Sequence, residues 1–186
     1  MATELYSSHP HGKIPNNRFP LLVHRAAVPG GGVEAVISVF RKNGWSNNWS
    51  NPGVYTYPHF HSTTHEVLGC ASGSMELNLS VGEGGFSRVK VSQGDVIVIP
   101  AGVSHADVGH SDDNMMCGGY VDGRDWDNVQ EAYLSDEDYR AACKRIMSLP
   151  IPERDPVSGL EMSAWVNAPP STEGWNEWRD ALDRSS

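Results

Sequence analysis

Three residues in the first half of the chain have the types and the spacing of metal ligands. His59 and His61 are two positions apart in an extended stretch, so both side chains should leave the same face of the backbone. A short turn at residues 62–64 follows, after which Glu66 can return its carboxylate to the same point. Two imidazoles and one carboxylate suit a divalent ion of iron, manganese, nickel, zinc or copper.

A second motif, residues 94–109 (GDVIVIPAGVSHADVG), offers a fourth ligand. A buried strand ends at Pro100, Gly102 makes a tight turn, and His105 starts the next strand. In a barrel that strand can lie opposite the first motif. Four protein ligands leave one or two positions open for water or substrate, which a catalytic metal requires. The predicted ligands of one divalent metal ion are His59, His61, Glu66 and His105.

Residues beside these ligands are candidates for proton transfer and for the substrate pocket. Asp107 is two positions beyond His105 and should share its inward face. There it could act as a general base beside Glu66, or hydrogen-bond a ligand histidine, or lie at the rim in water. The side chains expected to line a substrate pocket, with core packing as the alternative, are Tyr55, Tyr57, Leu68, Cys70 and Leu77.

The elements that must position these residues are short strands. Residues 75–81 alternate apolar and polar side chains, as in a half-buried strand, whereas residues 95–100 are a continuous apolar run, as in a strand buried on both faces. Turns rich in Gly, Ser and Asp separate the runs. This pattern predicts an all-β jelly-roll barrel. Further strands are expected at residues 21–24, 86–91 and 115–121.

A few helices should lie around the barrel. Val33, Val36, Ile37 and Phe40 have helical spacing and predict one outer helix that ends at Gly44. Ser135 precedes Asp138 by three positions, as in a capping box, and should open a second helix that Pro150 closes. A last short helix is expected from residue 175 to 182, near Trp175 and Trp178.

The expected organisation is therefore one domain with two extensions. Residues 1–20 should form an extended N-terminal arm, and residues 21–125 the barrel with its outer helix. Residues 126–186 should form a helical and extended segment packed on the barrel, because free aromatic tails are unfavourable in water.

Charge and composition restrict the partners. The formal net charge is -9, which disfavours nucleic acid and anionic membranes, since both need clustered Lys and Arg. The first ten residues lack the apolar run of a signal peptide, and no segment is apolar enough to span a membrane. The three cysteines have no paired spacing and indicate reduced thiols in a cytoplasmic protein.

Both motifs resemble those of the cupin superfamily. In the second motif, Gly109 stands where the family usually has Asn, which is not a metal ligand there. The resemblance implies a jelly-roll barrel with the metal inside and a likeness to barrels that commonly pair as homodimers. The matching positions are Gly53, His59, His61, Glu66 and Gly73 in the first motif, and Gly94, Pro100, Gly102 and His105 in the second.

A narrower resemblance runs from about residue 12 to about residue 165. Residues 12–23, 43–49, 59–69 and 118–127 are similar to the YjlB-like single-domain cupins. This similarity specifies the fold more closely but adds nothing on the reaction.

The expected function is that of a metal-dependent enzyme acting on a small organic molecule. A dioxygenase-type oxidoreductase with iron is preferred, because the ligand set suits redox metals. The alternatives are a metal-dependent decarboxylase, lyase or isomerase, and a non-catalytic cupin that binds a small molecule. A metal-independent isomerase using a His and Tyr pair is disfavoured, since all the metal ligands are retained.

Overall fold

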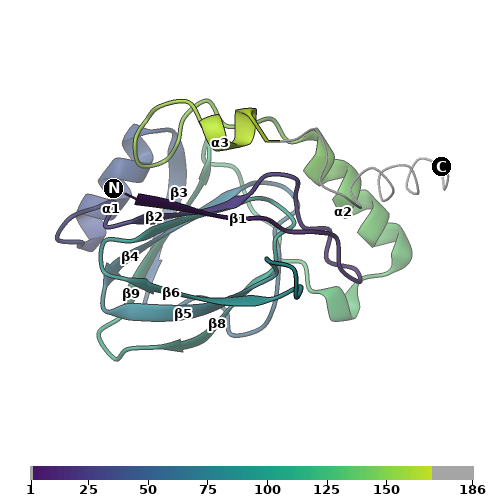
Figure 1. The fold of residues 1–186 in the computed structure, drawn as a ribbon, viewed down its shortest axis with the longest axis horizontal. Coiled ribbons are helices and arrows are strands. Elements are labelled where there is room, and N and C mark those ends of the chain that lie inside the picture. The colour runs from purple at the N-terminus through teal and green to yellow at the C-terminus, as the bar shows by residue number, and fades with distance from the viewer. Residues whose placement is uncertain (1, 169–186) are drawn as a thin grey trace.

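The computed structural model describes residues 2–168, and two antiparallel sheets form its centre (Figure 1). The six-stranded sheet has the order β1 (Ala2–Tyr6), β2 (Leu21–Arg25), β7 (Val96–Ile99), β4 (Glu66–Ser72), β9 (Met115–Val121) and β3 (Trp45–Asn51). The three-stranded sheet has the order β6 (Ser87–Ser92), β5 (Ser74–Leu79) and β8 (His105–His110). The prediction of a β fold with a few helices is confirmed.

The expected closed barrel is the part that differs. Among the described residues, ladder hydrogen bonds do not run from one sheet into the other around a ring. At the site, the two halves of the fold are joined by an isolated bridge between His59 and His105. The structure is therefore a pair of packed sheets, held by side chains in the middle and by this short bridge at one end.

The space between the two sheets is filled by apolar side chains. Alternate residues of β5 point inward as predicted, with Met75, Leu77 and Leu79 buried. All four residues of β7 are buried because this strand pairs with β2 and β4 and is covered on both faces. Each buried side chain of Val or Leu size contributes about 1.5–3 kcal/mol relative to exposure.

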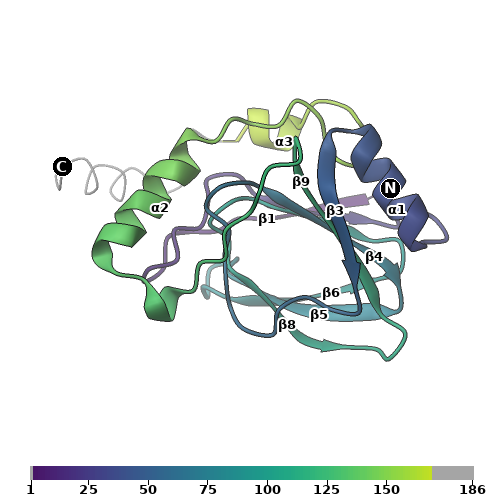
Figure 2. The ribbon, with the colours of Figure 1, turned by 180° about the vertical axis from the view of Figure 1, so that it is seen from behind.

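A second apolar cluster covers the outer face of the six-stranded sheet. Helix α1 (Val33–Lys42) lies there, as the spacing of its apolar residues predicts, and buries Val36 and Phe40. Short helix α3 (Ser163–Val166) adds Trp165, which is fully buried in the same cluster. Figure 2 shows both helices over this sheet, away from β5, β6 and β8. The C-terminal segment up to residue 168 thus packs on the sheets.

Part of the predicted N-terminal arm is a strand. Residues 2–6 form β1, which pairs antiparallel with β2 and lies at the edge of the six-stranded sheet. Arg25 stabilises this edge strand, because its guanidinium forms ion pairs with both Glu4 and Asp95 at 2.9 Å. Five residues with weak alternation give little sequence signal for a strand, which is why the pattern alone indicated only an extended arm.

Helix α2 (Asp136–Ser148) begins and ends close to where it was predicted. The Ser135 hydroxyl oxygen accepts a hydrogen bond from Asp138 N at 3.0 Å and caps the helix. A short 3₁₀ helix, η1 (Glu131–Tyr133), precedes it. The helix buries Ala142 and Ile146 against Phe60, directly after the first predicted ligand.

Trp175, Trp178 and the helix expected at residues 175–182 lie outside the described residues. None of the helices within residues 2–168 has the length and apolarity needed to cross a membrane.

A buried contact between the Asp155 carboxylate and His24 connects the C-terminal segment to β2, and the ionisation of Asp155 should make stability depend on pH. Asp155 Oδ2 lies 2.9 Å from His24 Nε2, and Asp155 Oδ1 accepts hydrogen bonds from Val157 N and Ser158 N. Burial alone would raise the pKa of Asp155, but His24 and the two N–H groups outweigh it and lower that pKa to about 2.

Because this pKa lies below its ordinary value of 3.8, the contacts of the ionised Asp155 carboxylate stabilise the fold above that value, and this stabilisation is lost as the pH falls towards 2. We expect Asp155→Asn to lower the free energy of unfolding at pH 7 by about 1–3 kcal/mol. Urea unfolding at pH 7 and at pH 3 measures this, and the difference from wild type should shrink at pH 3. An equal difference at both pH values would contradict the assignment.

Candidate metal centre

The bridge between His59 and His105 brings two of the predicted ligands together. His59 N donates to His105 O at 3.2 Å, and His105 N donates to His59 O at 2.9 Å. The two ring centroids are consequently 4.2 Å apart. His61 lies two positions on, and its ring centroid is 5.3 Å from each of the other two. One ligand atom from each of the three histidines lies within 4.8 Å of the other two.

Each of the three rings is held by a hydrogen bond from Nδ1 to a backbone carbonyl. His59 Nδ1 donates to Tyr57 O at 3.1 Å, His105 Nδ1 donates to Val103 O at 3.2 Å, and His61 Nδ1 donates to Asp127 O. A carbonyl can only accept, so Nδ1 carries the proton whenever a ring is neutral. The lone pair is then on Nε2, as in histidines that bind a metal through that atom.

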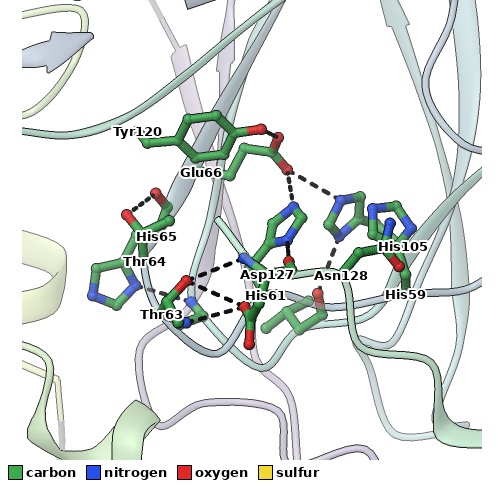
Figure 3. A network of polar contacts seen from close by, with 12 residues as sticks. His59, His61, Thr63, Thr64, His65, Glu66, His105, Tyr120, Asp127 and Asn128 are labelled. Carbon is green, nitrogen blue, oxygen red and sulfur yellow. Dashed lines mark hydrogen bonds and ion pairs between the residues drawn. The ribbon is translucent and has the colours of Figure 1, made fainter. Parts of the chain in front are cut away.

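The predicted carboxylate ligand meets two of these rings (Figure 3). Glu66 Oε2 lies 3.3 Å from His61 Nε2 and 3.1 Å from His105 Nε2. The other oxygen, Oε1, accepts a hydrogen bond from the Tyr120 hydroxyl at 2.9 Å. Tyr120 therefore holds one carboxylate oxygen and leaves the other directed at the histidines.

Tyr120 is itself positioned by Trp49, which sequence reasoning did not place at the site. Trp49 Nε1 donates to the Tyr120 hydroxyl oxygen at 3.0 Å. The indole lies against Gly118, where an added Cβ would come within 2.1 Å of the ring. A residue without a side chain at position 118 is thus required for the chain of hydrogen bonds from Trp49 through Tyr120 to Glu66.

The charges of Glu66 and His59 are those of metal ligands, whereas His61 holds a proton more tightly than a free histidine. Burial would raise the pKa of Glu66, but the imidazoles of His61 and His105 outweigh it and hold that pKa well below its usual range. Burial and the neighbouring rings lower the pKa of His59 to about 3. Burial would lower the pKa of His61, but Glu66 outweighs it and raises that pKa. Near neutral pH, Glu66 is an anion and His59 a neutral donor, the forms that bind a cation.

Two buried atoms of the site indicate that a cation fits between these side chains. His61 Nε2 and Glu66 Oε2 are shielded from solvent, and neither makes a well-directed hydrogen bond to a described residue. Buried polar atoms without such partners are rare, because leaving them so is costly. Three imidazole nitrogens and one carboxylate oxygen form a donor set that suits a first-row transition metal or zinc.

A cavity of about 470 Å³ opens over these four side chains. Of the five residues predicted to line a pocket, Tyr55 does so. Tyr57 does not line the cavity and instead stacks on Tyr55, with ring centroids 5.0 Å apart. Leu68, Cys70 and Leu77 are buried in the cluster between the sheets and do not line the cavity. Burial raises the pKa of the Cys70 thiol to about 11, so at neutral pH it is an uncharged core residue.

Asp107 faces inward but is not directed into the cavity. Its carboxylate contacts His110 Nδ1 at 2.6 Å and accepts a hydrogen bond from Gly109 N at 2.8 Å. It is buried and does not line the cavity. This position suits a residue that fixes the end of β8 better than a general base at the metal.

Comparison with known proteins identifies the family. The cupin family matches residues 45–122, which include all four predicted ligands. YjlB of Bacillus subtilis (strain 168), an uncharacterized protein, is 35% identical over an alignment of 169 positions that covers 88% of this chain and 97% of YjlB. The chain is a YjlB-like cupin.

Solved structures similar to this cupin include two proteins that hold a metal ion. Acireductone dioxygenase from Bacillus anthracis, with cadmium in its active centre, has a TM-score of 0.41 and 17% identity, over 52% of this chain and 63% of that chain. Bacillus subtilis oxalate decarboxylase, with Mn(II) centres, has a TM-score of 0.38 and 19% identity, over 80% of this chain and 37% of that chain. The cupin thus spans less than two thirds of either protein.

Asp127 is a further residue at the cupin's site that its sequence did not single out. Its backbone oxygen accepts the Nδ1 proton of His61, and its carboxylate holds the turn that follows (Figure 3). Asp127 Oδ1 accepts hydrogen bonds from Ser62 N at 2.6 Å and Thr63 N at 3.3 Å, and Oδ2 accepts one from the Ser62 hydroxyl. Arg145 of helix α2 donates from Nε to Ser62 Oγ at 2.9 Å.

We expect Asp127→Ala to weaken zinc binding by this cupin about 10- to 100-fold, the usual effect of removing a group that orients a metal ligand. Without the carboxylate, the turn and the carbonyl that fixes His61 lose their anchor. Competition with a chromogenic chelator measures the affinity. Asp127→Asn keeps one acceptor and should lose less, and Asp112→Ala, on an exposed turn, serves as a control. Equal affinities of Asp127→Ala and wild type would show that His61 needs no such support.

Proposed function

We propose that this cupin is a metal-dependent enzyme that acts on a small organic molecule. The observation that carries the proposal is the cluster of three histidine nitrogens within 4.8 Å of one another, on residues that line a cavity of about 470 Å³. His59, His61, Glu66 and His105 would hold one divalent ion. Iron is favoured, because a set of three imidazoles and one carboxylate suits redox metals.

The chemistry of such an ion is to polarise an oxygen-bearing substrate and, with iron or copper, to bring in dioxygen. The protein supplies the surroundings. Burial raises the pKa of Tyr120 far above its usual range, so its hydroxyl keeps its proton and continues to donate to Glu66. The fixed carboxylate and the three held rings limit reorganisation when a substrate binds, which is the main contribution that a preorganised site can make.

We propose a dioxygenase-type oxidoreduction as the reaction. Such a reaction adds both atoms of O₂ to the substrate and needs no other reductant. The alternative is a decarboxylation, elimination or isomerisation at the same site, in which no oxygen is consumed. Each of these uses the same metal ligands, so the two groups of reactions are separated by oxygen consumption and not by the geometry of the ligands.

Metal analysis of the purified protein, followed by oxygen uptake, tests the proposal. We expect bound iron or manganese near one ion per chain, and uptake of one O₂ per molecule of substrate consumed. Turnover at the same rate without oxygen would exclude the dioxygenase and favour the decarboxylase, lyase or isomerase. Wild-type protein that binds no divalent metal, whether purified or reconstituted, would overturn the proposed function.

We also propose that the protein acts in the cytoplasm as a homodimer with its small-molecule substrate as the other partner. The exposed edge strand β1 offers free backbone groups for pairing with a second copy. Light scattering after size-exclusion chromatography should give twice the chain mass of 20.3 kDa. A mass equal to one chain at micromolar concentration would contradict the dimer.

A further inference from the structure

The wall of the cavity over the metal centre contains an unusual group of amide side chains. Asn47, Asn48 and Asn51, all on β3, line it. Regular strand alternation would not place neighbouring residues on one wall. Here the register of β3 against β9 shifts between Ser46 and Trp49, and Asn47 has a left-handed backbone with φ of 54°. A bulge of this kind re-aims side chains, often beside functional sites.

These amides supply both donors and acceptors to whatever occupies the cavity. Asn48 Nδ2 donates to Trp45 O and to Gly118 O, both at 3.2 Å, which fixes how the amide is turned. Its Oδ1 is buried and accepts no hydrogen bond from any described residue. Asn47 and Asn51 are exposed. A purely apolar ligand would cover Asn47 and Asn51 without replacing their hydrogen bonds to water, at a cost in binding free energy.

Aromatic rings make up much of the remaining wall. Tyr55 is 44% exposed and Trp126 is 37% exposed, so each presents a large part of its ring to solvent. Trp126 stacks on Tyr120, with ring centroids 6.0 Å apart and an angle of 25° between the rings. Exposed aromatic rings at a cavity provide flat apolar surfaces for a ring-shaped ligand.

Positive side chains are missing from this wall. None of the described residues that line the cavity is Lys or Arg, and its acidic group is the Glu66 carboxylate beside the three histidines. Phosphate groups and polycarboxylates are usually recognised by Arg or Lys. A ligand with such groups would have only the metal to neutralise it. The wall therefore favours an uncharged ligand.

We infer that the substrate is an uncharged, polyhydroxylated ring, namely an unphosphorylated sugar or a cyclic polyol. Its hydroxyl groups match the Asn side chains, and its C–H faces match Tyr55 and Trp126. A cavity of about 470 Å³ lies in the range typical of small-molecule sites and exceeds what a two-carbon acid would fill. The inference rests on the proposed function, because the residues of the candidate metal centre line the same cavity.

Titration calorimetry on the full chain loaded with zinc tests the inference, since zinc has no redox chemistry and prevents oxidation during the titration. The probes are D-fructose, myo-inositol, D-fructose 6-phosphate and catechol, and zinc content is measured first. We expect D-fructose or myo-inositol to bind, and Asn51→Leu to weaken that binding about 5-fold, the value of one lost hydrogen bond. Asn78→Leu is the matched control, because Asn78 lies on β5 and does not line the cavity.

Four results would overturn the substrate class while leaving the proposed function intact: tighter binding of D-fructose 6-phosphate than of D-fructose, binding of catechol alone, binding of no probe by zinc-loaded protein, or sugar binding by Asn51→Leu equal to that of wild type. Failure of the wild type to bind zinc is a different result. It would overturn the proposed function, and the substrate class with it.

Discussion

A His61→Ala variant of this cupin will leave purification with almost no bound metal, whereas wild-type protein will hold close to one ion per chain. His61 is buried, its Nδ1 is held by Asp127 O, and its Nε2 lies 3.3 Å from Glu66 Oε2. The substitution removes one ligand and leaves the anionic Glu66 with one fewer neighbouring imidazole. Loss of a residue that only hydrogen-bonds to a metal ligand lowers metal affinity by about 10- to 100-fold. Loss of a ligand itself should therefore lower the affinity by more than about 100-fold.

The measurement is elemental analysis of purified protein, followed by zinc titration of chelator-treated protein. His61→Gln keeps a polar side chain of similar size, and circular dichroism shows whether each variant is folded, so that loss of metal is not confused with loss of structure. His11→Ala is the matched control, because His11 is an exposed histidine away from the site. A folded His61→Ala or His61→Gln that binds zinc as tightly as wild type would disprove the metal centre.

The second large effect concerns stability. Trp165→Ala should lower the free energy of unfolding by about 3–5 kcal/mol, the range for truncating a buried large aromatic residue. Trp165 is fully buried and stacks on Phe19, with ring centroids 4.9 Å apart and an angle of 6° between the rings. It also packs edge-on against His65, and its Nε1 donates to Pro20 O at 2.8 Å. The substitution removes all of these contacts and leaves a cavity beside the six-stranded sheet.

Urea unfolding followed by circular dichroism measures this difference. Leu160→Ala, at a position that is 71% exposed in the same C-terminal segment, should change stability by less than about 0.5 kcal/mol. If Trp165→Ala cost less than about 1 kcal/mol, the segment after residue 150 would contribute little to the fold. Metal should be removed from both variants first, because a ligand bound to the native state adds to apparent stability.

The convergence of His59, His61 and His105 could be predicted from sequence because their positions follow local rules. His59 and His61 lie on the same face because alternate residues of an extended strand point the same way. Gly73 and Gly102 mark turns that can be recognised from the sequence. Their supporting residues could not be predicted in this way. Tyr120 is 54 positions from Glu66, and Asp127 is 66 positions from His61. Such contacts depend on how β9 and the following segment return to the site, which no local pattern specifies.

The alternation of residues along the strands predicted more pocket residues than the structure shows. Alternation along β4 and β5 correctly placed Leu68 and Leu77 on the inward face. Both side chains belong to the core cluster between the sheets, however, and neither lines the cavity. Asp107 is inward as well, yet the nearby partners His110 and Gly109 decide where its carboxylate points. Strand phase predicts a side of the sheet. It does not predict depth along the strand or the choice among competing hydrogen bonds.

Helix α2 is connected to the metal centre through Arg145, Ser62, Asp127 and His61 in turn. Linkage is reciprocal, so if docking of α2 keeps His61 oriented for an ion, an ion on His61 must keep α2 docked by the same free energy. The docking of the helix would then report on whether the site is occupied. Opening of α2 becomes rarer as the site fills, and metal-depleted cells would contain this protein with one helix more often detached and open to proteases.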